Sequence, residues 1–187
     1  MFKSKLKLTG KIIFFFSVII LMPIFASSKN IKSKNDQYSN FSNTNFNSQI
    51  FFSKHNSGDG NVLGALKINL KPGWKIYWRN PGEAGLPPEL DWSDVENLKK
   101  VEFLFPAPER FNFFGIETFG YTNEVIFPIK ISKLNKKSPV KGVLKFDAQI
   151  CKEVCVPIER KFEIHSNIHI GNLNQIKKIK QFLLKVP

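Results

Sequence analysis

The chain has 187 residues, which is enough for one ordinary domain with attachments and too few for two full-sized domains. Hydrophobic residues make up 42% and charged residues 23%, a globular composition that excludes disorder throughout the chain. The formal net charge of +13 points at first to nucleic-acid binding, but most of this net charge comes from the two ends of the chain. The region 48–171 holds 17 basic and 14 acidic residues, so we expect no nucleic-acid partner.

The first 28 residues have the pattern of a secretory signal peptide. Four lysines among the first eleven residues precede an apolar stretch over 12–25, and Ala26 and Ser28 suit a signal-peptidase site. A retained membrane anchor is the alternative, but fourteen residues are short for a bilayer core that needs about 20. We therefore expect cleavage after Ser28 and a mature protein in an extracytoplasmic, oxidising compartment.

Residues 29–47 are rich in Asn and Ser and show little periodicity, so we expect a flexible leader there. Beyond it, apolar and polar residues alternate with a period of two, which is typical of half-buried strands. The pattern predicts strands at 50–54, 62–70, 74–79, 101–105, 125–131, 140–150 and 156–164. Pro157 favours an edge position for the last of them.

This arrangement predicts an all-β, immunoglobulin-like antiparallel sandwich over residues 48–171. A short amphipathic helix is expected over 172–187, because Ile176, Ile179 and Leu183 fall on one helical face. Trp74, Ile76 and Trp78 alternate onto one face of their strand, which favours the core. A carbohydrate-stacking surface is the alternative for these aromatic residues.

Cys151 and Cys155 are the only cysteines, spaced C-x-x-x-C, and in an exported chain such a pair is able to form a disulfide. A bridge closing so short a loop stabilises by only about 2 kcal/mol, against about 4.7 for a 100-residue loop. A redox-active disulfide is therefore favoured over a structural clip. A zinc site with His165 and His169 is the third interpretation, although histidines four apart in a strand lie about 13 Å from each other.

Three segments match a known family: 73–92 (GWKIYWRNPGEAGLPPELDW), 105–129 (FPAPERFNFFGIETFGYTNEVIFPI) and 151–157 (CKEVCVP). The chain resembles the N-terminal periplasmic domain of the DsbD family of thiol:disulfide interchange proteins, particularly its stand-alone alpha-proteobacterial relatives. The resemblance covers roughly residues 50–165 and implies an immunoglobulin-like fold that carries a redox cysteine pair in the periplasm. It implies no cofactor, no metal and no stable small-molecule ligand.

The resemblance also implies the partners and the roles of residues. A membrane reductant supplies electrons, which the domain passes to thioredoxin-like periplasmic proteins in processes such as cytochrome c maturation. Cys155 forms the mixed disulfide and Cys151 resolves it, as in a protein-disulfide reductase. A cap loop within 110–121 shields the pair, and the candidate shielding residues are Phe111, Phe113, Phe114, Phe119 and Tyr121.

Two departures from the family pattern stand out. The best-known members separate their cysteines by five residues rather than three, and this sequence ends after the short helix. We therefore expect a separate membrane electron donor. Asp147, four residues before Cys151 on the same strand face, is a candidate aid to proton transfer, with a solvated surface acid as the alternative. A non-catalytic binding module with a passive disulfide remains the alternative function.

Overall fold

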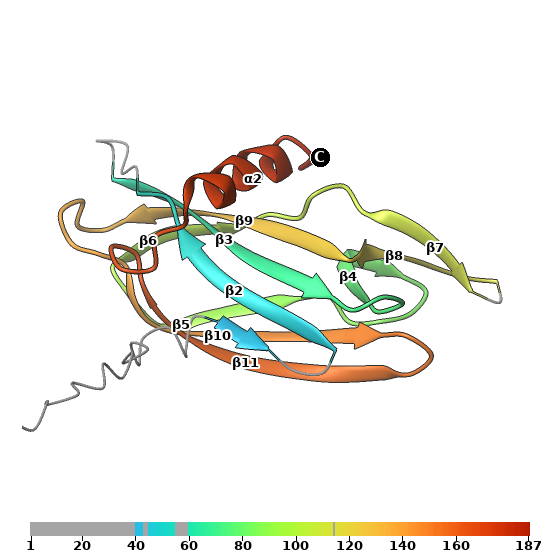
Figure 1. Ribbon diagram of the computed structural model, residues 1–187. Helices are drawn as coiled ribbons and strands as arrows, with labels where there is room; N and C mark the ends of the chain where they lie inside the picture. The colour runs from blue at the N-terminus through green and yellow to red at the C-terminus, as the bar shows by residue number, and fades with distance from the viewer. Residues whose placement is uncertain (1–39, 43–44, 55–59, 114) are drawn as a thin grey trace, which may run out of the picture. The chain divides into compact units, whose positions relative to one another are not determined.

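The computed structural model describes residues 40–42, 45–54, 60–113 and 115–187 (Figure 1). The expected signal peptide and most of the expected leader lie outside the described residues. Within the described part, β-strands dominate and one helix follows them, α2 (Leu173–Leu183). That part of the chain contains no helix with the length and apolar character of a membrane span.

The strands form two antiparallel sheets. The first sheet has the order β1-β2-β3-β9-β6 and the second has the order β11-β10-β4-β8-β7, with β5 paired to β10 as well. The predicted all-β, immunoglobulin-like sandwich with a C-terminal helix is thus confirmed. The strand bounds are β1 Asn40–Ser42, β2 Phe46–Phe52, β3 Asn61–Leu70, β4 Lys75–Gly82, β5 Glu89–Glu96, β6 Leu98–Phe103, β7 Glu109–Phe113, β8 Ile116–Thr122, β9 Glu124–Lys133, β10 Lys141–Cys151 and β11 Cys155–His165.

Strand β10 is the strand on which the site is built. Along its whole length it pairs with β11, which is an edge strand as Pro157 predicted. Its other side is shared, because β5 pairs with residues 141–147 and β4 pairs with Ile150 and Cys151. The end of β10 that carries Cys151 therefore lies beside the start of β4.

The core lies between the inner faces of the two sheets. Ile76, Phe127 and Phe146 are fully buried there, and Phe127 packs edge to face against Tyr121. The three tryptophans are partly buried and pack against this core, which confirms the expectation for Trp74 and Trp78. Burial of so many large apolar side chains provides the main driving force for folding.

Several expectations about local structure were wrong. Residues 40–42 and 46–47 form β1 and the start of β2, although both stretches were assigned to the flexible leader. Strand β5 lies where no strand was predicted, because its largely exposed, polar residues give no apolar run. Strands β7 and β8 form a hairpin where no strand was predicted, in the region expected to hold the cap loop. In each case backbone pairing with a neighbouring strand supplies what the local pattern lacks.

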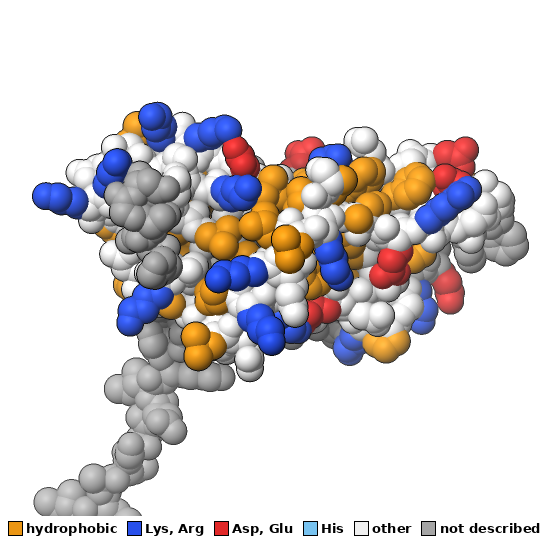
Figure 2. Space-filling model, turned by 90° about the horizontal axis from the view of Figure 1, so that it is seen from above, with side chains coloured by type: hydrophobic (Ala, Val, Ile, Leu, Met, Phe, Trp, Pro, Cys, Tyr) orange, Lys and Arg blue, Asp and Glu red, His pale blue; other side chains and the backbone are white. Residues whose placement is uncertain are grey.

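Helix α2 covers the outer face of the first sheet (Figure 1). Ile179 is completely buried against Phe51, Ala65 and Ile126. Asn172 caps the helix in a reciprocal capping box with Gln175. From the side on which α2 lies, hydrophobic side chains are bordered by lysines and arginines (Figure 2).

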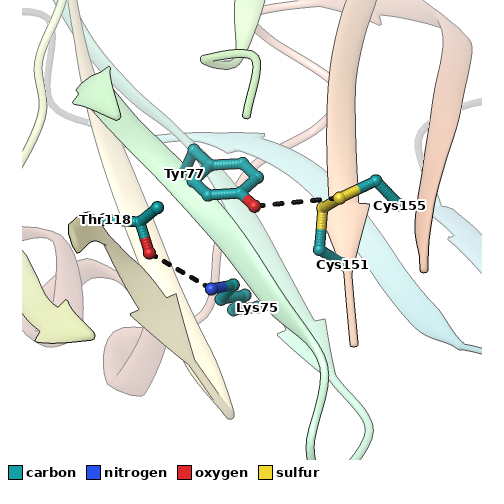
Figure 3. The surroundings of a disulfide bond; sticks show 5 residues. All are labelled: Lys75, Tyr77, Thr118, Cys151 and Cys155. Carbon is teal, nitrogen blue, oxygen red and sulfur yellow. Dashed lines mark hydrogen bonds between the residues drawn. A yellow bond between two sulfur atoms is a disulfide. The ribbon is translucent and has the colours of Figure 1, made fainter. Parts of the chain in front are cut away.

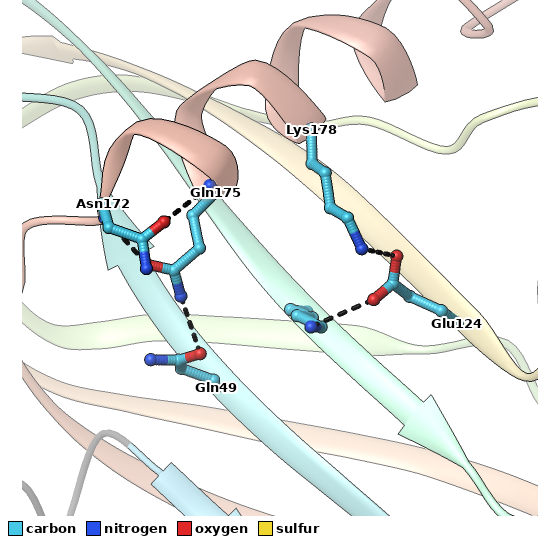
Figure 4. A network of polar contacts seen from close by, with 6 residues as sticks. Gln49, Glu124, Asn172, Gln175 and Lys178 are labelled. Atoms are coloured by element: carbon cyan, nitrogen blue, oxygen red, sulfur yellow. Dashed lines mark hydrogen bonds and ion pairs between the residues drawn. The ribbon is translucent and has the colours of Figure 1, made fainter.

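Polar contacts also fix the helix to this sheet (Figure 4). The amide of Gln175 donates to Gln49 at 2.9 Å. Glu124 on β9 accepts from Lys178 of the helix at 2.6 Å and pairs with Lys67 of β3 at 3.0 Å. The carboxylate of Glu124 thus bridges the helix and two neighbouring strands.

Candidate functional site

A disulfide closes the tip of the β10–β11 hairpin. Cys151 ends β10 and Cys155 begins β11, and the two residues are direct partners in the antiparallel register. Their Cα atoms are 4.1 Å apart and their sulfur atoms are bonded. The three-residue turn between them is closed by a hydrogen bond from the Lys152 amide to the Val154 carbonyl. The hairpin itself therefore holds the two cysteines together.

The two cysteines differ in their access to solvent. Cys151 is only 2% exposed, whereas Cys155 belongs to the exposed residues of the tip. Val154 beside it is 68% exposed, and Val156 on its other side is exposed as well. A protein that approaches the tip can therefore reach Cys155, which lies between two exposed valines.

Strand β4 brings Tyr77 to the disulfide (Figure 3). Lys75 on β4 is the register partner of Cys151, so the side chains of these two residues share a face of the sheet. Tyr77 lies two residues further along the same face, and its hydroxyl oxygen is 3.8 Å from Cys155 Sγ. A disulfide sulfur carries no hydrogen, so the Tyr77 hydroxyl is the donor of this contact.

The Tyr77 ring is held in place by the chain around it. Tyr77 is 2% exposed, and any side chain at Gly85 would collide with its ring. Burial raises the pKa of Tyr77 above its ordinary value of 10.0. The phenol therefore keeps its proton at neutral pH and remains a hydrogen-bond donor.

Lys75 is half-buried on the same face. Its Nζ donates to the Thr118 hydroxyl on β8 at 3.1 Å. The same Nζ lies 5.5 Å from the centre of the Tyr77 ring and 5.2 Å from that of Phe111 on β7. Desolvation by burial lowers the pKa of Lys75 from its ordinary value of 10.5.

The structure divides the candidate shielding residues between the two faces of the β7–β8 hairpin. Phe111 lies on the disulfide face, where it contacts Lys75. Phe119 lies on the opposite face, because it follows Thr118 along the strand. Tyr121 is buried in the core and its hydroxyl donates to the Pro106 carbonyl at 2.7 Å. Phe114 and the side chain of Phe113 lie outside the described residues.

Asp147 is exposed and lies on the same face of β10 as Cys151. Four residues of strand separate them, which corresponds to about 13 Å. This separation is too long for direct proton transfer between a carboxylate and a thiol.

The histidines of the zinc interpretation lie at the other end of β11. Cys155 and His165 are its first and last residues, so about 33 Å separates them. The expectation that His165 and His169 lie apart in one strand was wrong, because the chain turns after His165. The His165 amide donates to His169 Nδ1 at 3.1 Å. The two histidines are close to each other but far from the cysteines.

Sequence reasoning missed Lys75 and Tyr77. The period-two alternation in WKIYWR places both on the face opposite Ile76, which is the signal that they avoid the core. Nothing in the local sequence indicates that β4 lies beside the end of β10, because the pairing joins residues 75 and 151.

Known proteins that resemble the chain were found among family models and among solved structures. Residues 47–167 match the family described as thiol:disulfide interchange protein DsbD, N-terminal. Among solved structures, the N-terminal periplasmic domain of ScsB from Proteus mirabilis is 27% identical with a TM-score of 0.64, covering 80% of this chain and 59% of that one. The N-terminal domain of DsbD from Neisseria meningitidis, in the reduced form, is 20% identical with a TM-score of 0.36, covering 63% of this chain and 84% of that one. No curated protein matches the chain.

Proposed function

Since the chain belongs to the family of the N-terminal domain of the thiol:disulfide interchange protein DsbD, we propose that it is a thiol–disulfide exchange protein. In this proposal the Cys151–Cys155 pair passes reducing equivalents between a membrane reductant and thioredoxin-like periplasmic proteins. The observation that carries it is a disulfide at a hairpin tip, in which Cys155 is exposed and Cys151 is buried. This asymmetry suits a pair in which one sulfur meets the partner and the other stays within the protein.

The exchange proceeds in two balanced steps. In the reduced protein, the Cys155 thiolate attacks one sulfur of the partner's disulfide, so that a mixed disulfide forms and the partner's other sulfur leaves as a thiolate. Cys151, deprotonated, then attacks Cys155 Sγ, which restores the Cys151–Cys155 bond and releases the partner as a dithiol. Two electrons and two protons have then moved to the partner. A dithiol of the membrane reductant returns them by the reverse sequence.

Tyr77 supports this assignment of roles. Its hydroxyl already points at Cys155 Sγ in the oxidised pair. Once the pair is reduced, the same hydroxyl is able to donate to the Cys155 thiolate, and a hydrogen bond to the charged form favours that form. Asp147 does not reach the pair, so we assign it no role in the exchange.

The surroundings of Cys155 suit a docking partner. Val154 and Val156 flank it. A pocket of about 270 Å³ begins two residues away, and its lining combines apolar residues such as Leu86, Pro87 and Pro157 with three carboxylates, Glu89, Asp147 and Glu159. Leu86 is 60% exposed. Exposed apolar residues gathered beside a reactive group are typical of an interaction surface. We assign this surface to the thioredoxin-like partner.

The β7–β8 hairpin is our candidate for the cap that shields the pair between encounters. Phe111 lies on the disulfide face and is tied to β4 through Lys75. The tip of the hairpin, where Phe113 and Phe114 stand in the sequence, follows along the same strand. Phe119 and Tyr121 face away from the disulfide, so we exclude them from the shielding set.

We place the protein in the periplasm, reached through a cleaved signal peptide over residues 1–28. The ScsB structure that the chain resembles is that of a periplasmic domain, and disulfides persist in such an oxidising compartment. Determining the N-terminal residue of the protein recovered from the periplasm tests this. Residue 29 is the expected start, and a protein that keeps Met1 contradicts the proposal.

Trapping of the mixed disulfide tests the exchange directly. The reduced Cys151→Ala variant, mixed with an oxidised thioredoxin-like protein, is expected to accumulate a covalent adduct that dithiothreitol dissolves. The matched Cys155→Ala variant is expected to give no adduct, because its remaining cysteine is buried. Adducts with Cys155→Ala alone would reverse the two roles. Absence of adducts with both variants would leave the disulfide as a passive clip and refute the proposal.

A further inference from the structure

Lys75, whose backbone pairs with Cys151, carries a half-buried ammonium group that points toward β8. Lys75 is the backbone partner of Cys151, and strand β4 runs between β8 and β10 (Figure 3). The contacts of its Nζ are the Thr118 hydroxyl and the rings of Tyr77 and Phe111. All three groups are uncharged, so they hold the ammonium in place without neutralising it.

No carboxylate in the described part of the chain forms an ion pair with Lys75. Among the residues that the structure describes, the ion pairs of Asp and Glu go to other lysines and to Arg110. An ammonium that loses water without gaining a carboxylate is destabilised, which is why burial lowers the pKa of Lys75. A negative charge that formed nearby would relieve this cost.

The other charged groups near the pair are exposed. Lys152 and Glu153 occupy the turn between the cysteines, and solvent surrounds both. The stem of Lys152 lies against Gly73, within 3.0 Å of where a side chain at that glycine would be. Water and salt screen such exposed charges far more than half-buried ones. Solvent therefore screens the charge of Lys75 less than it screens the charge of Lys152.

We propose that Lys75 is a positioning residue that stabilises the thiolate of Cys155 after the disulfide is reduced. The inference rests on the proposed function, because the thiolate is formed only in the reduced pair. A dithiol that reduces the pair supplies two electrons and two protons, so that the S–S bond breaks into two thiols. Cys155 then releases one proton to water, and the resulting negative charge lies in the field of the Lys75 ammonium.

The charge of Lys75 determines the direction and size of the expected shift in the titration of the Cys155 thiol. A positive charge favours the thiolate, so its removal makes the thiol harder to ionise. At an effective dielectric constant near 20, a unit charge about 10 Å away shifts a titration by about one pH unit. This corresponds to an about tenfold change in the thiolate fraction at a fixed pH below the midpoint.

Titration of the single remaining thiol in the full-length Cys151→Ala protein tests the proposal. The thiolate absorbance is followed against pH in that background alone and with one further substitution. Lys75→Met is expected to raise the midpoint by about one pH unit. Lys75→Arg keeps the charge and is expected to restore the parent midpoint. Lys152→Met, which removes the neighbouring exposed charge, is the matched control and is expected to shift the midpoint by less than about a third as much.

Thr118→Val separates electrostatics from packing. It removes the hydrogen bond to Lys75 but keeps the ammonium, so the shift is expected to be smaller than that of Lys75→Met. Equal shifts in Thr118→Val and Lys75→Met would make the role structural and overturn the inference. An unchanged midpoint in Lys75→Met, or equal shifts with Lys152→Met, would overturn it as well. These outcomes concern only the reduced thiol, so they are distinct from a failure of exchange, which trapping of the mixed disulfide detects.

Discussion

The two outer faces of the sandwich are used differently. On the first sheet, α2 covers the outer face and buries Phe51, Ala65 and Ile126. On the second sheet, the outer face carries the disulfide at an exposed tip, with Tyr77 and Lys75 beside it. One face is sealed by a helix and fixed by polar contacts, while the other presents a sulfur atom to the surroundings.

The difference follows from which residues occupy the outward positions. An apolar outward residue such as Ile126 gains free energy only if another element covers it, and the apolar side of α2 does so. Tyr77 and Lys75 combine an apolar body with a polar end, so they pack against their neighbours and still direct a donor or a charge toward the site. The helix-covered outer face thus adds to the stability of the fold, while the other outer face carries the disulfide.

The largest effect is expected from a substitution in the contact between α2 and the first sheet. Ile179→Ala removes a fully buried side chain from the contact with Phe51, Ala65 and Ile126, and should lower the free energy of unfolding by about 2–4 kcal/mol. Urea denaturation measures this. The matched control is Leu173→Ala, because Leu173 is 88% exposed on the same helix and its loss should change stability little. A changed reduction potential in folded Ile179→Ala would contradict the separation of the two faces.

An intermediate effect is expected when the hydroxyl beside the disulfide, on the outer face of the second sheet, is removed. Tyr77→Phe removes the hydroxyl that points at Cys155, and a hydrogen bond to a charged group is worth about 1.5 kcal/mol. The midpoint of the Cys155 thiol should therefore rise by about one pH unit, measured by thiolate absorbance.

Tyr121→Phe is the matched control on the core side. Its hydroxyl donates to Pro106, so its loss should cost about 1 kcal/mol of stability and leave the thiol midpoint unchanged. If both tyrosine variants moved the midpoint equally, the assignment of Tyr77 to the site would be wrong.

The smallest effect is expected from the loss of a polar contact between α2 and the first sheet. Burial alone would raise the pKa of Glu124, but the hydrogen bonds and charges of Lys178 and Lys67 outweigh it and hold the pKa below its ordinary value of 4.5. The stability from this lowered pKa is present above pH 4.5 and is lost as the pH falls through the folded-state pKa. Glu124→Gln should lower stability at pH 7 by up to about 1 kcal/mol and weaken its decline with acid.

Denaturation at several pH values measures the Glu124 effect. Glu102→Gln is the control, because the Lys100–Glu102 pair is exposed and its loss should leave the denaturation midpoint unchanged at neutral pH. If the stability of Glu124→Gln depended on pH as that of the parent does, the ion pairs of Glu124 would not hold the helix to the sheet.

The parts of the fold that the sequence predicted are those in which local pattern and burial agree. Alternation placed Ile76 in the core and identified β10 and β11 within one or two residues, because one face of each strand is apolar. Strands β5, β7 and β8 escaped prediction because backbone pairing with their neighbours, rather than an apolar face of their own, determines them.

The site was predictable only in part, for a related reason. The cysteine spacing and the hairpin were readable because both lie within one short stretch. Asp147 was assigned to the correct face of β10. Sharing a face does not make two residues neighbours, however, and about 13 Å of strand separates Asp147 from Cys151. Tyr77 and Lys75 come to the disulfide through the pairing of β4 with β10, and such long-range register depends on the whole sheet.

The most direct measurement is the reduction potential of the Cys151–Cys155 pair in the full-length protein, obtained by equilibration in glutathione buffers. Our account predicts a potential of roughly −180 to −270 mV, the range of known exchange proteins. A potential below about −300 mV would identify a structural disulfide and contradict the account.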